Sequence, residues 1–251
     1  MTMTSTPVDT VVPLVRPETM ALAATENERV LDLLSALDED DWARPTECPA
    51  WDVRALAAHV VGGMEAFASI REFVHQMRAG GKAAGDRPFI DGMTEVQVGD
   101  RASLSREQLL ERLDEVGPRV ARARGRVPRL FRRMPLKQEL PGGTKETWRM
   151  GYLLDVILTR DTWMHRVDLA RATGRPLVLT PEHDGRIVAD VVAEWARRHT
   201  RPFTLHLEGP AGGTFTSGVD GEEITIDAVQ FCRILSRRAT GPGLLTQEVP
   251  F

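Results

Sequence analysis

The chain has 251 residues, of which 42% are hydrophobic and 27% charged, which is typical of a globular protein with one large domain or two ordinary ones. Its net charge of −4 argues against nucleic-acid binding, which generally uses a strongly basic surface. The two cysteines, Cys48 and Cys232, lie far apart in the sequence. They therefore indicate neither a disulfide scaffold nor a thiolate metal site, and they fit a reducing cytoplasm.

Residues 1–16 have no basic start and no apolar run of the length found in signal peptides. Nowhere in the chain is there an uninterrupted apolar stretch of ~18 residues, the length needed to cross a membrane. We therefore interpret residues 1–16 as a flexible N-terminal arm and expect a cytoplasmic protein with no membrane partner.

Residues 17–174 are predicted to form an antiparallel four-helix bundle, because apolar periodicity and capping signals recur along this segment. Asp52 and Thr144 can cap the second and fourth helices, and Gly62-Gly63 is a weak point in the second. Gly117-Pro118 is expected to kink or split the third. The expected helices are residues 17–37, residues 53–77, a helix that begins at the capping box Ser105–Gln108, and residues 144–174.

Between these helices, residues 78–101 have glycines, a proline and mixed polarity, so they are expected to form a long connection. The segment Arg119 to Arg133 has seven arginines in fifteen residues. It is either a solvated helix face and turn or a patch that binds an acidic ligand. Pro141-Gly142-Gly143 predicts a break before the fourth helix.

Residues 175–251 change in character and are predicted to form a small α+β domain. Strand-like alternation occurs three times, separated by glycine turns, and apolar periodicity predicts a helix on either side. The expected elements are a helix at 181–200, strands at 202–207, 214–216 and 223–226, and a helix that begins near 227. The predicted fold class of the whole chain is therefore α+β.

Polar residues interrupt the apolar face of the fourth helix. Asp161, His165 and Asp168 have the spacing i, i+4 and i+7, which puts them on one helical face. Buried groups of this kind need hydrogen bonds, ion pairs or a metal. His59 interrupts the apolar face of the second helix in the same way. From spacing alone the residues are either a metal site or ordinary half-buried polar residues with structural partners.

The stretch Cys48-Pro49-Ala50-Trp51-Asp52-Val53-Arg54-Ala55-Leu56-Ala57-Ala58-His59, followed by Asp161, His165 and Asp168, resembles the mycothiol-dependent maleylpyruvate isomerase family. That family is part of the DinB-like group of metal-binding four-helix bundles. The ending, with Phe231-Cys232-Arg233 and Leu244-Leu245, is also similar to the family's small C-terminal α+β domain.

The resemblance implies that His59, Asp161 and His165 bind a divalent metal, usually zinc. The sequence departs from the family in having Asp161 where glutamate is usual. This leaves two alternatives open: the two helices lie closer together and the shorter carboxylate binds the metal directly, or the carboxylate binds the metal through a water molecule. Asp168 is expected beside the metal ligands or against the thiol, with a catalytic or cofactor-binding role. Arg101 is also assigned to cofactor binding. Cys48 is not expected to be the nucleophile, because nothing in the sequence places a base beside it.

The implied cofactors are a divalent metal and mycothiol, a low-molecular-weight thiol. Three protein ligands leave a position open, and a thiol bound there becomes a thiolate nucleophile that can attack a small electrophilic substrate. The sequence leaves open whether the result is isomerisation or thiol transfer. A non-catalytic, metal-containing binding or regulatory module is the alternative hypothesis, and the oligomeric state is equally open.

Overall fold

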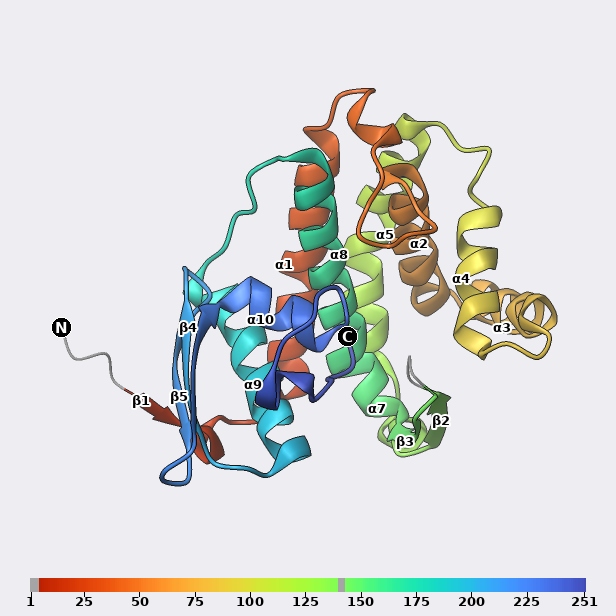
Figure 1. Cartoon of the computed structure of the whole chain (residues 1–251). Coiled ribbons are helices and arrows are strands. Elements are labelled where there is room, and N and C mark those ends of the chain that lie inside the picture. Colours follow the sequence, from red (N-terminus) through yellow and green to blue (C-terminus); the bar gives the residue numbers. More distant parts are fainter. Residues whose placement is uncertain (1–4, 140–142) are drawn as a thin grey trace. The chain divides into compact units, whose positions relative to one another are not determined.

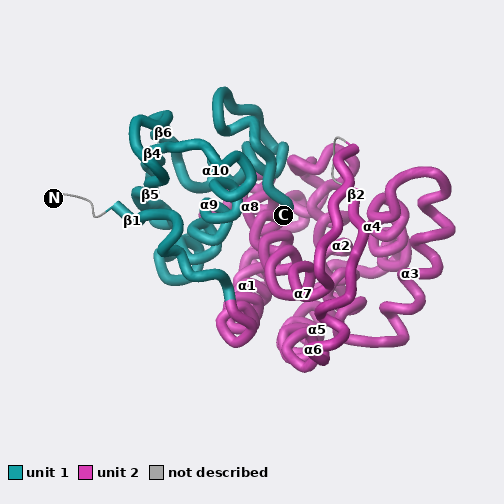
Figure 2. Tube along the Cα trace, turned by 90° about the horizontal axis from the view of Figure 1, so that it is seen from below, with its two compact units in different colours: residues 1–14, 177–251 teal, residues 15–176 magenta. Residues whose placement is uncertain are grey.

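The computed structural model describes residues 5–139 and 143–251 (Figure 1). Two compact units divide the chain: the larger consists of residues 15–176, and the smaller combines residues 1–14 with residues 177–251 (Figure 2). The larger unit contains the helical bundle and the smaller one a four-stranded sheet with helices, so the predicted α+β fold class is confirmed. Among the described residues, no helix combines the length and the apolar character that crossing a membrane requires.

Four long helices build the bundle in the larger unit. Helix α5 packs against α1 and α2, and α8 packs against the same two helices. Apolar side chains from all four close the interior, among them Val30, Leu56, Leu113 and Leu169, each at most 1% exposed. The helices are α1 (Arg16–Ser35), α2 (Val53–Ala68), α5 (Arg106–Arg126) and α8 (Leu158–Thr173).

The expected long connection at residues 78–101 is wrong, because this region is mostly helical. Helix α2 ends at Ala68, not near Met77, and Ser69 then caps α3 (Ile70–Ala84) by accepting from the Glu72 amide. Helix α4 (Phe89–Gly99) follows and packs against α3 (Figure 1).

The glycines in this region are packing residues. A Cβ added to Gly92 would lie 2.2 Å from the Gly80 carbonyl oxygen, so only glycine permits this approach of α3 and α4. The glycines that suggested a loop therefore mark the contact between two helices.

The expected kink at Gly117-Pro118 does not divide the third helix. Helix α5 continues through Pro118 to Arg126, and its start at Ser105 has both hydrogen bonds of the predicted capping box. The side chain of Asn27 on α1 donates to the Gly117 carbonyl at 3.0 Å, which ties this part of α5 to its neighbour. Tertiary contacts of this kind can outweigh the helix-breaking tendency of proline.

The fourth helix begins later than expected, and Thr144 is not its cap. A short helix, α6 (Arg129–Arg132), and an antiparallel hairpin of β2 (Pro135–Glu139) and β3 (Lys145–Arg149) come first. Leu136 lies opposite Trp148 in the hairpin, and such cross-strand apolar pairs favour strands over a helix. Pro141 and Gly142 of the predicted break lie outside the described residues, while Gly143 has a positive φ of 84°.

Helical structure then resumes and leads directly into α8. Helix α7 (Met150–Tyr152) is followed by a π-helical stretch, Leu153–Ile157, and by α8. A π-helical stretch inside a helix changes the register of the residues that follow, and such stretches are frequent at functional sites.

The smaller unit contains the α+β region. The strand order is β1-β5-β4-β6, with β4 antiparallel to β5 and parallel to β6. Trp195, Phe203 and Phe231 form an aromatic cluster in its core. The elements are β1 (Ser5–Pro7), α9 (Arg186–His199), β4 (Phe203–Glu208), β5 (Gly213–Ser217), β6 (Glu222–Asp227) and α10 (Ala228–Leu235).

The expectation of a flexible arm at residues 1–16 is wrong for the described part of that segment. Residues 5–7 form β1, which pairs in parallel with β5, and Val8–Thr10 form a short 3-10 helix. Backbone hydrogen bonding to a strand more than 200 residues away determines this structure, and no local pattern reveals such pairing.

Candidate metal centre

Three of the predicted site residues come together inside the bundle. Helix α2 carries His59, and helix α8 carries Asp161 and His165. Nε2 of His165 lies 3.3 Å from one Asp161 carboxylate oxygen, and Nε2 of His59 lies 3.9 Å from the other. The histidines are 8% and 5% exposed, whereas the Asp161 side chain is 36% exposed, so the site has one accessible side.

These distances fit a bound divalent cation. With metal–ligand bonds of roughly 2.1 Å in tetrahedral geometry, neighbouring ligand atoms lie about 3.4 Å apart. The distances from Asp161 to the two imidazoles bracket that value, and the two rings meet edge to face with centroids 4.9 Å apart. Two imidazoles and a carboxylate are also a ligand set that catalytic zinc uses.

A glutamine orients the first imidazole. Nδ1 of His59 lies 2.8 Å from the Gln97 amide oxygen on α4, so Nδ1–H donates and the lone pair on Nε2 faces Asp161. Gln97 in turn donates to Gln76 on α3, which donates to the Gly62 carbonyl on α2. Sequence reasoning missed Gln97 because its segment had the composition of a loop.

A carboxylate orients the second imidazole. Nδ1 of His165 lies 3.0 Å from Oδ2 of Asp168, which is completely buried one turn further along α8. The carboxylate fixes the tautomer that leaves Nε2 of His165 facing Asp161. Metal-binding histidines are commonly supported in this way, so both rings have the support expected of ligands.

The two imidazoles differ in protonation. Burial, together with the charge of His165, lowers the pKa of His59 to about 4, so this ring is neutral at neutral pH. Burial also acts to lower the pKa of His165. The charge of Asp161 and hydrogen bonds to Asp161, Asp168 and Cys48 outweigh that effect and raise this pKa well above its usual value. The surroundings of His165 thus favour a positive charge at its ring. When no metal is bound, a proton on the imidazole supplies this charge.

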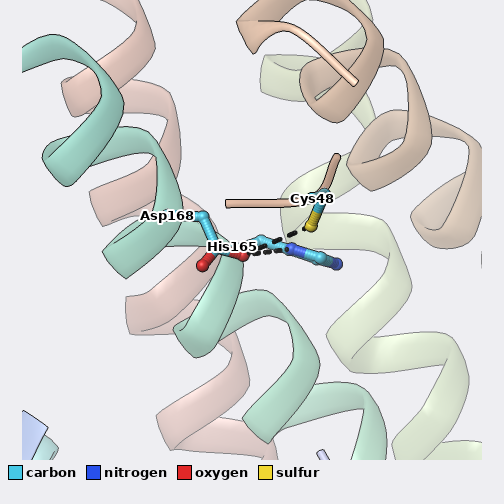
Figure 3. A group of neighbouring side chains, drawn as sticks. All are labelled: Cys48, His165 and Asp168. Carbon is cyan, nitrogen blue, oxygen red and sulfur yellow. Dashed lines mark hydrogen bonds and ion pairs between the residues drawn. The ribbon is translucent and has the colours of Figure 1, made fainter. Parts of the chain in front are cut away.

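Cys48 is closer to this cluster than the sequence suggested. Its Sγ lies 3.7 Å from Oδ2 of Asp168, and Figure 3 shows the thiol directed toward His165 and Asp168. The carboxylate of Asp168 therefore lies beside Cys48, which nothing in the sequence indicated, while the expectation that Cys48 is not the nucleophile stays a prediction. Thr46 holds the loop by donating to the Trp51 carbonyl at 2.8 Å, and Trp51 stacks on the His59 ring at 4.7 Å.

Arg101 follows directly after the end of α4 and is 2% exposed. Its guanidinium donates to Glu65, to Glu72 and to the Gln97 carbonyl. A Cβ on Gly62 would lie 2.9 Å from its Nη1, so this glycine makes room for the arginine. In the structure Arg101 supports the helix α4 that carries Gln97.

The arginine-rich segment is neither wholly solvated nor a single patch. Arg124 and Arg132 are buried, whereas Arg122 and Arg126 are exposed. Arg132 donates to both oxygens of Asp155 at 2.6 and 2.5 Å. The interpretation as a solvated face therefore holds only for the exposed arginines, and binding of an acidic ligand by this segment stays a prediction.

The fold and the cluster together define a class: helical bundles whose facing helices bring together side chains of the types that bind a divalent cation. The chain belongs to the mycothiol maleylpyruvate isomerase family. The model of that family's N-terminal domain matches residues 23–170 and confirms the resemblance to this enzyme family.

Two solved structures are similar in fold. One is a crystal structure of the mycothiol-dependent maleylpyruvate isomerase, with 18% identity, a TM-score of 0.57 and 98% of each chain covered. The other is a histidine-to-alanine mutant of a mycothiol-dependent maleylpyruvate isomerase. It has 16% identity and a TM-score of 0.56, with 94% of this chain and 93% of that chain covered. No curated protein sequence matches the chain.

Proposed function

We propose that the protein is a metal-dependent enzyme that uses mycothiol to isomerise a small electrophilic substrate or to transfer the thiol to it. One observation carries the proposal: Nε2 of both His59 and His165 faces the carboxylate of Asp161, at 3.9 and 3.3 Å. The similar solved protein is described as mycothiol-dependent, which supports the choice of thiol.

In this proposal His59, Asp161 and His165 hold the metal directly, and zinc is the expected ion because of the ligand types. A cation bound there lowers the pKa of a thiol cofactor and so supplies a thiolate nucleophile at neutral pH. Asp161 supplies the negative charge that offsets the cation, and its partial exposure leaves one side of the centre open to ligands.

Asp168 acts in this proposal as a positioning residue. It is completely buried and bonded to His165 and Cys48, so it acts through the imidazole. Arg101 acts on the centre only indirectly, through Gln97. All three nitrogens of its guanidinium group already donate to Glu65, Glu72 or the Gln97 carbonyl, so none is left for the cofactor. In this proposal both residues therefore position the metal ligands, in place of the direct contact with the cofactor that was expected from the sequence.

The test is to replace the metal with cobalt(II) and to titrate the protein with mycothiol and, in parallel, with glutathione. A thiolate that enters the cobalt coordination sphere gives a strong sulfur-to-metal charge-transfer band. We expect this band with mycothiol at lower concentration than with glutathione. His59→Ala is the negative control, and Cys48→Ser excludes a contribution from the protein's own thiol.

If neither thiol changes the cobalt spectrum of the wild type, the enzyme proposal fails. The metal-containing binding module then becomes the better description of the chain. If both thiols change it equally, the metal centre stands but the preference for mycothiol does not.

A further inference from the structure

A small cavity lies within the bundle, beside the metal centre. Its volume is about 30 Å³, and it is lined by His59 and Asp161 together with Arg124, Phe67 and Thr162. Because one buried water needs roughly 10–15 Å³, this is room for about two waters or for one small planar group such as a carboxylate.

Arg124 is the cationic residue of this cavity. It is 3% exposed, and burial lowers the pKa of its guanidinium to about 10, so it remains charged at neutral pH. Nε donates to the Leu154 carbonyl at 2.8 Å, and Nη2 donates to the Thr159 hydroxyl at 2.8 Å. In the part of the chain that the structure describes, Nη1 has no hydrogen-bond partner.

Three other buried arginines of the larger unit, Arg101, Arg132 and Arg166, each have a carboxylate partner. Arg101 is bonded to Glu65 and Glu72, Arg132 to Asp155, and Arg166 to Glu26. Among the described residues, no carboxylate lies within 4 Å of the Arg124 guanidinium. The negative charge that acts on it is that of Asp155, which is already paired with Arg132.

A buried cation with only neutral partners is costly, and an anion that joins it offsets the loss of hydration. The two existing bonds of Arg124 fix the plane of its guanidinium and leave the Nη1 side for a ligand. An arginine held in this way is suited to a carboxylate, which can accept two parallel hydrogen bonds.

We propose that Arg124 binds a carboxylate group of the substrate in the cavity beside His59 and Asp161. The substrate is then a small electrophile that carries a carboxylate, with its reactive carbon toward the metal centre and its charged end on Arg124. This inference rests on the proposed function for the identity of the ligand as substrate. The anion site itself is a property of Arg124 and can be tested separately.

The test is calorimetric titration of the zinc-loaded protein with maleate and, in parallel, with its uncharged dimethyl ester. We expect the wild type to bind maleate and to bind the ester at least tenfold more weakly, because hydrogen bonds to charged groups are lost. Arg124→Gln should weaken maleate binding about tenfold or more and leave the ester unaffected. Arg126→Gln, which changes an exposed arginine of the same helix, should bind both as the wild type does.

Binding to the metal has to be distinguished from binding to Arg124. We expect maleate to leave the spectrum of the cobalt-substituted protein unchanged when the carboxylate lies on Arg124. Arg124→Lys, which keeps a cation but loses the planar fork, should bind maleate with intermediate affinity. Thermal unfolding and zinc content of each variant identify any loss caused by misfolding.

Equal binding of maleate and ester by the wild type overturns the proposal without use of any variant. Equal maleate binding by wild type and folded, zinc-loaded Arg124→Gln also overturns it. Neither result bears on the thiol-induced cobalt spectrum, so failure of the anion site and failure of the proposed enzyme remain distinguishable.

Discussion

The amide oxygen of Gln97 on α4 lies 2.8 Å from Nδ1 of His59 on α2. This contact makes a residue outside the four bundle helices responsible for the orientation of the imidazole that we propose as a metal ligand. Gln97→Leu should leave Nδ1–H without an acceptor and lower zinc affinity by about 10–100-fold. Competition with a chelator of known affinity measures the change. Gln97→Glu returns an acceptor and should recover part of the affinity, and unchanged affinity in Gln97→Leu would contradict this role.

His59→Ala and His165→Ala should each purify with much less than one zinc per chain, because each variant leaves only two protein ligands. Elemental analysis of the purified proteins gives the metal content. His75→Ala is the matched control, since His75 is exposed and pairs with Asp100 at 2.7 Å. Full metal content in both ligand variants would show that the cluster is not the metal site.

The carboxylate oxygens of Asp161 lie 3.3 and 3.9 Å from Nε2 of the two imidazoles, which favours direct binding of Asp161 to the metal. Glutamate is longer by about 1.5 Å, one carbon–carbon bond, whereas metal–oxygen bonds tolerate only about 0.2 Å of misfit. Asp161→Glu should therefore lower zinc affinity, and Asp161→Asn should lower it further because the charge is lost. Asp114→Glu, on the exposed side of α5, is the control. Tighter zinc binding by Asp161→Glu would show instead that the native carboxylate is too short.

Zinc binding should depend on pH through His165. The negative charge of Asp161 and hydrogen bonds to Asp161 and Asp168 outweigh burial and raise the pKa of His165, so the metal-free protein holds a proton there at neutral pH. The metal must displace that proton, and affinity should fall about tenfold for each pH unit below this pKa and level off above it. His59, with a pKa of about 4, does not compete for a proton near neutral pH.

Chelator competition at several pH values between about 5 and 8 measures this slope. Asp168→Asn removes a charged acceptor of the His165 proton, so the pH-dependent range should move to lower pH. The same variant should bind zinc more weakly at high pH, because the imidazole loses its charged support. An affinity that does not change with pH would contradict the protonation of His165.

The proximity of Asp161 and His165 could be predicted from the sequence because helical spacing alone puts them on one face. Gln97 could not, since a glutamine 38 positions from its partner carries no local signal. Gly62 shows the same limit, because the sequence indicated it as a weak point in the second helix. In the structure an added Cβ would instead meet Gln97 and Arg101 of the region after α3. Supporting contacts of this kind follow from tertiary packing, which the sequence pattern does not specify.

The hairpin before α8 and the first strand were missed for a related reason. Strands β2 and β3 are short and alternate between half-buried and exposed residues, so their apolar signal is weak. Strand β1 has only three residues and depends on a distant partner. Both lack the long periodic pattern that identified the bundle helices.

The parallel pairing of β1 with β5 has a consequence for the order of folding during synthesis. Ser5 and Pro7 are made first, yet their partners Thr214 and Thr216 are made only after the whole bundle. The bundle segment can therefore fold while the sheet still lacks its later strands, and β1 must wait unpaired for β5. A shortened chain without residues 1–14 would leave β5 as an open sheet edge, and such edges promote aggregation of the finished protein.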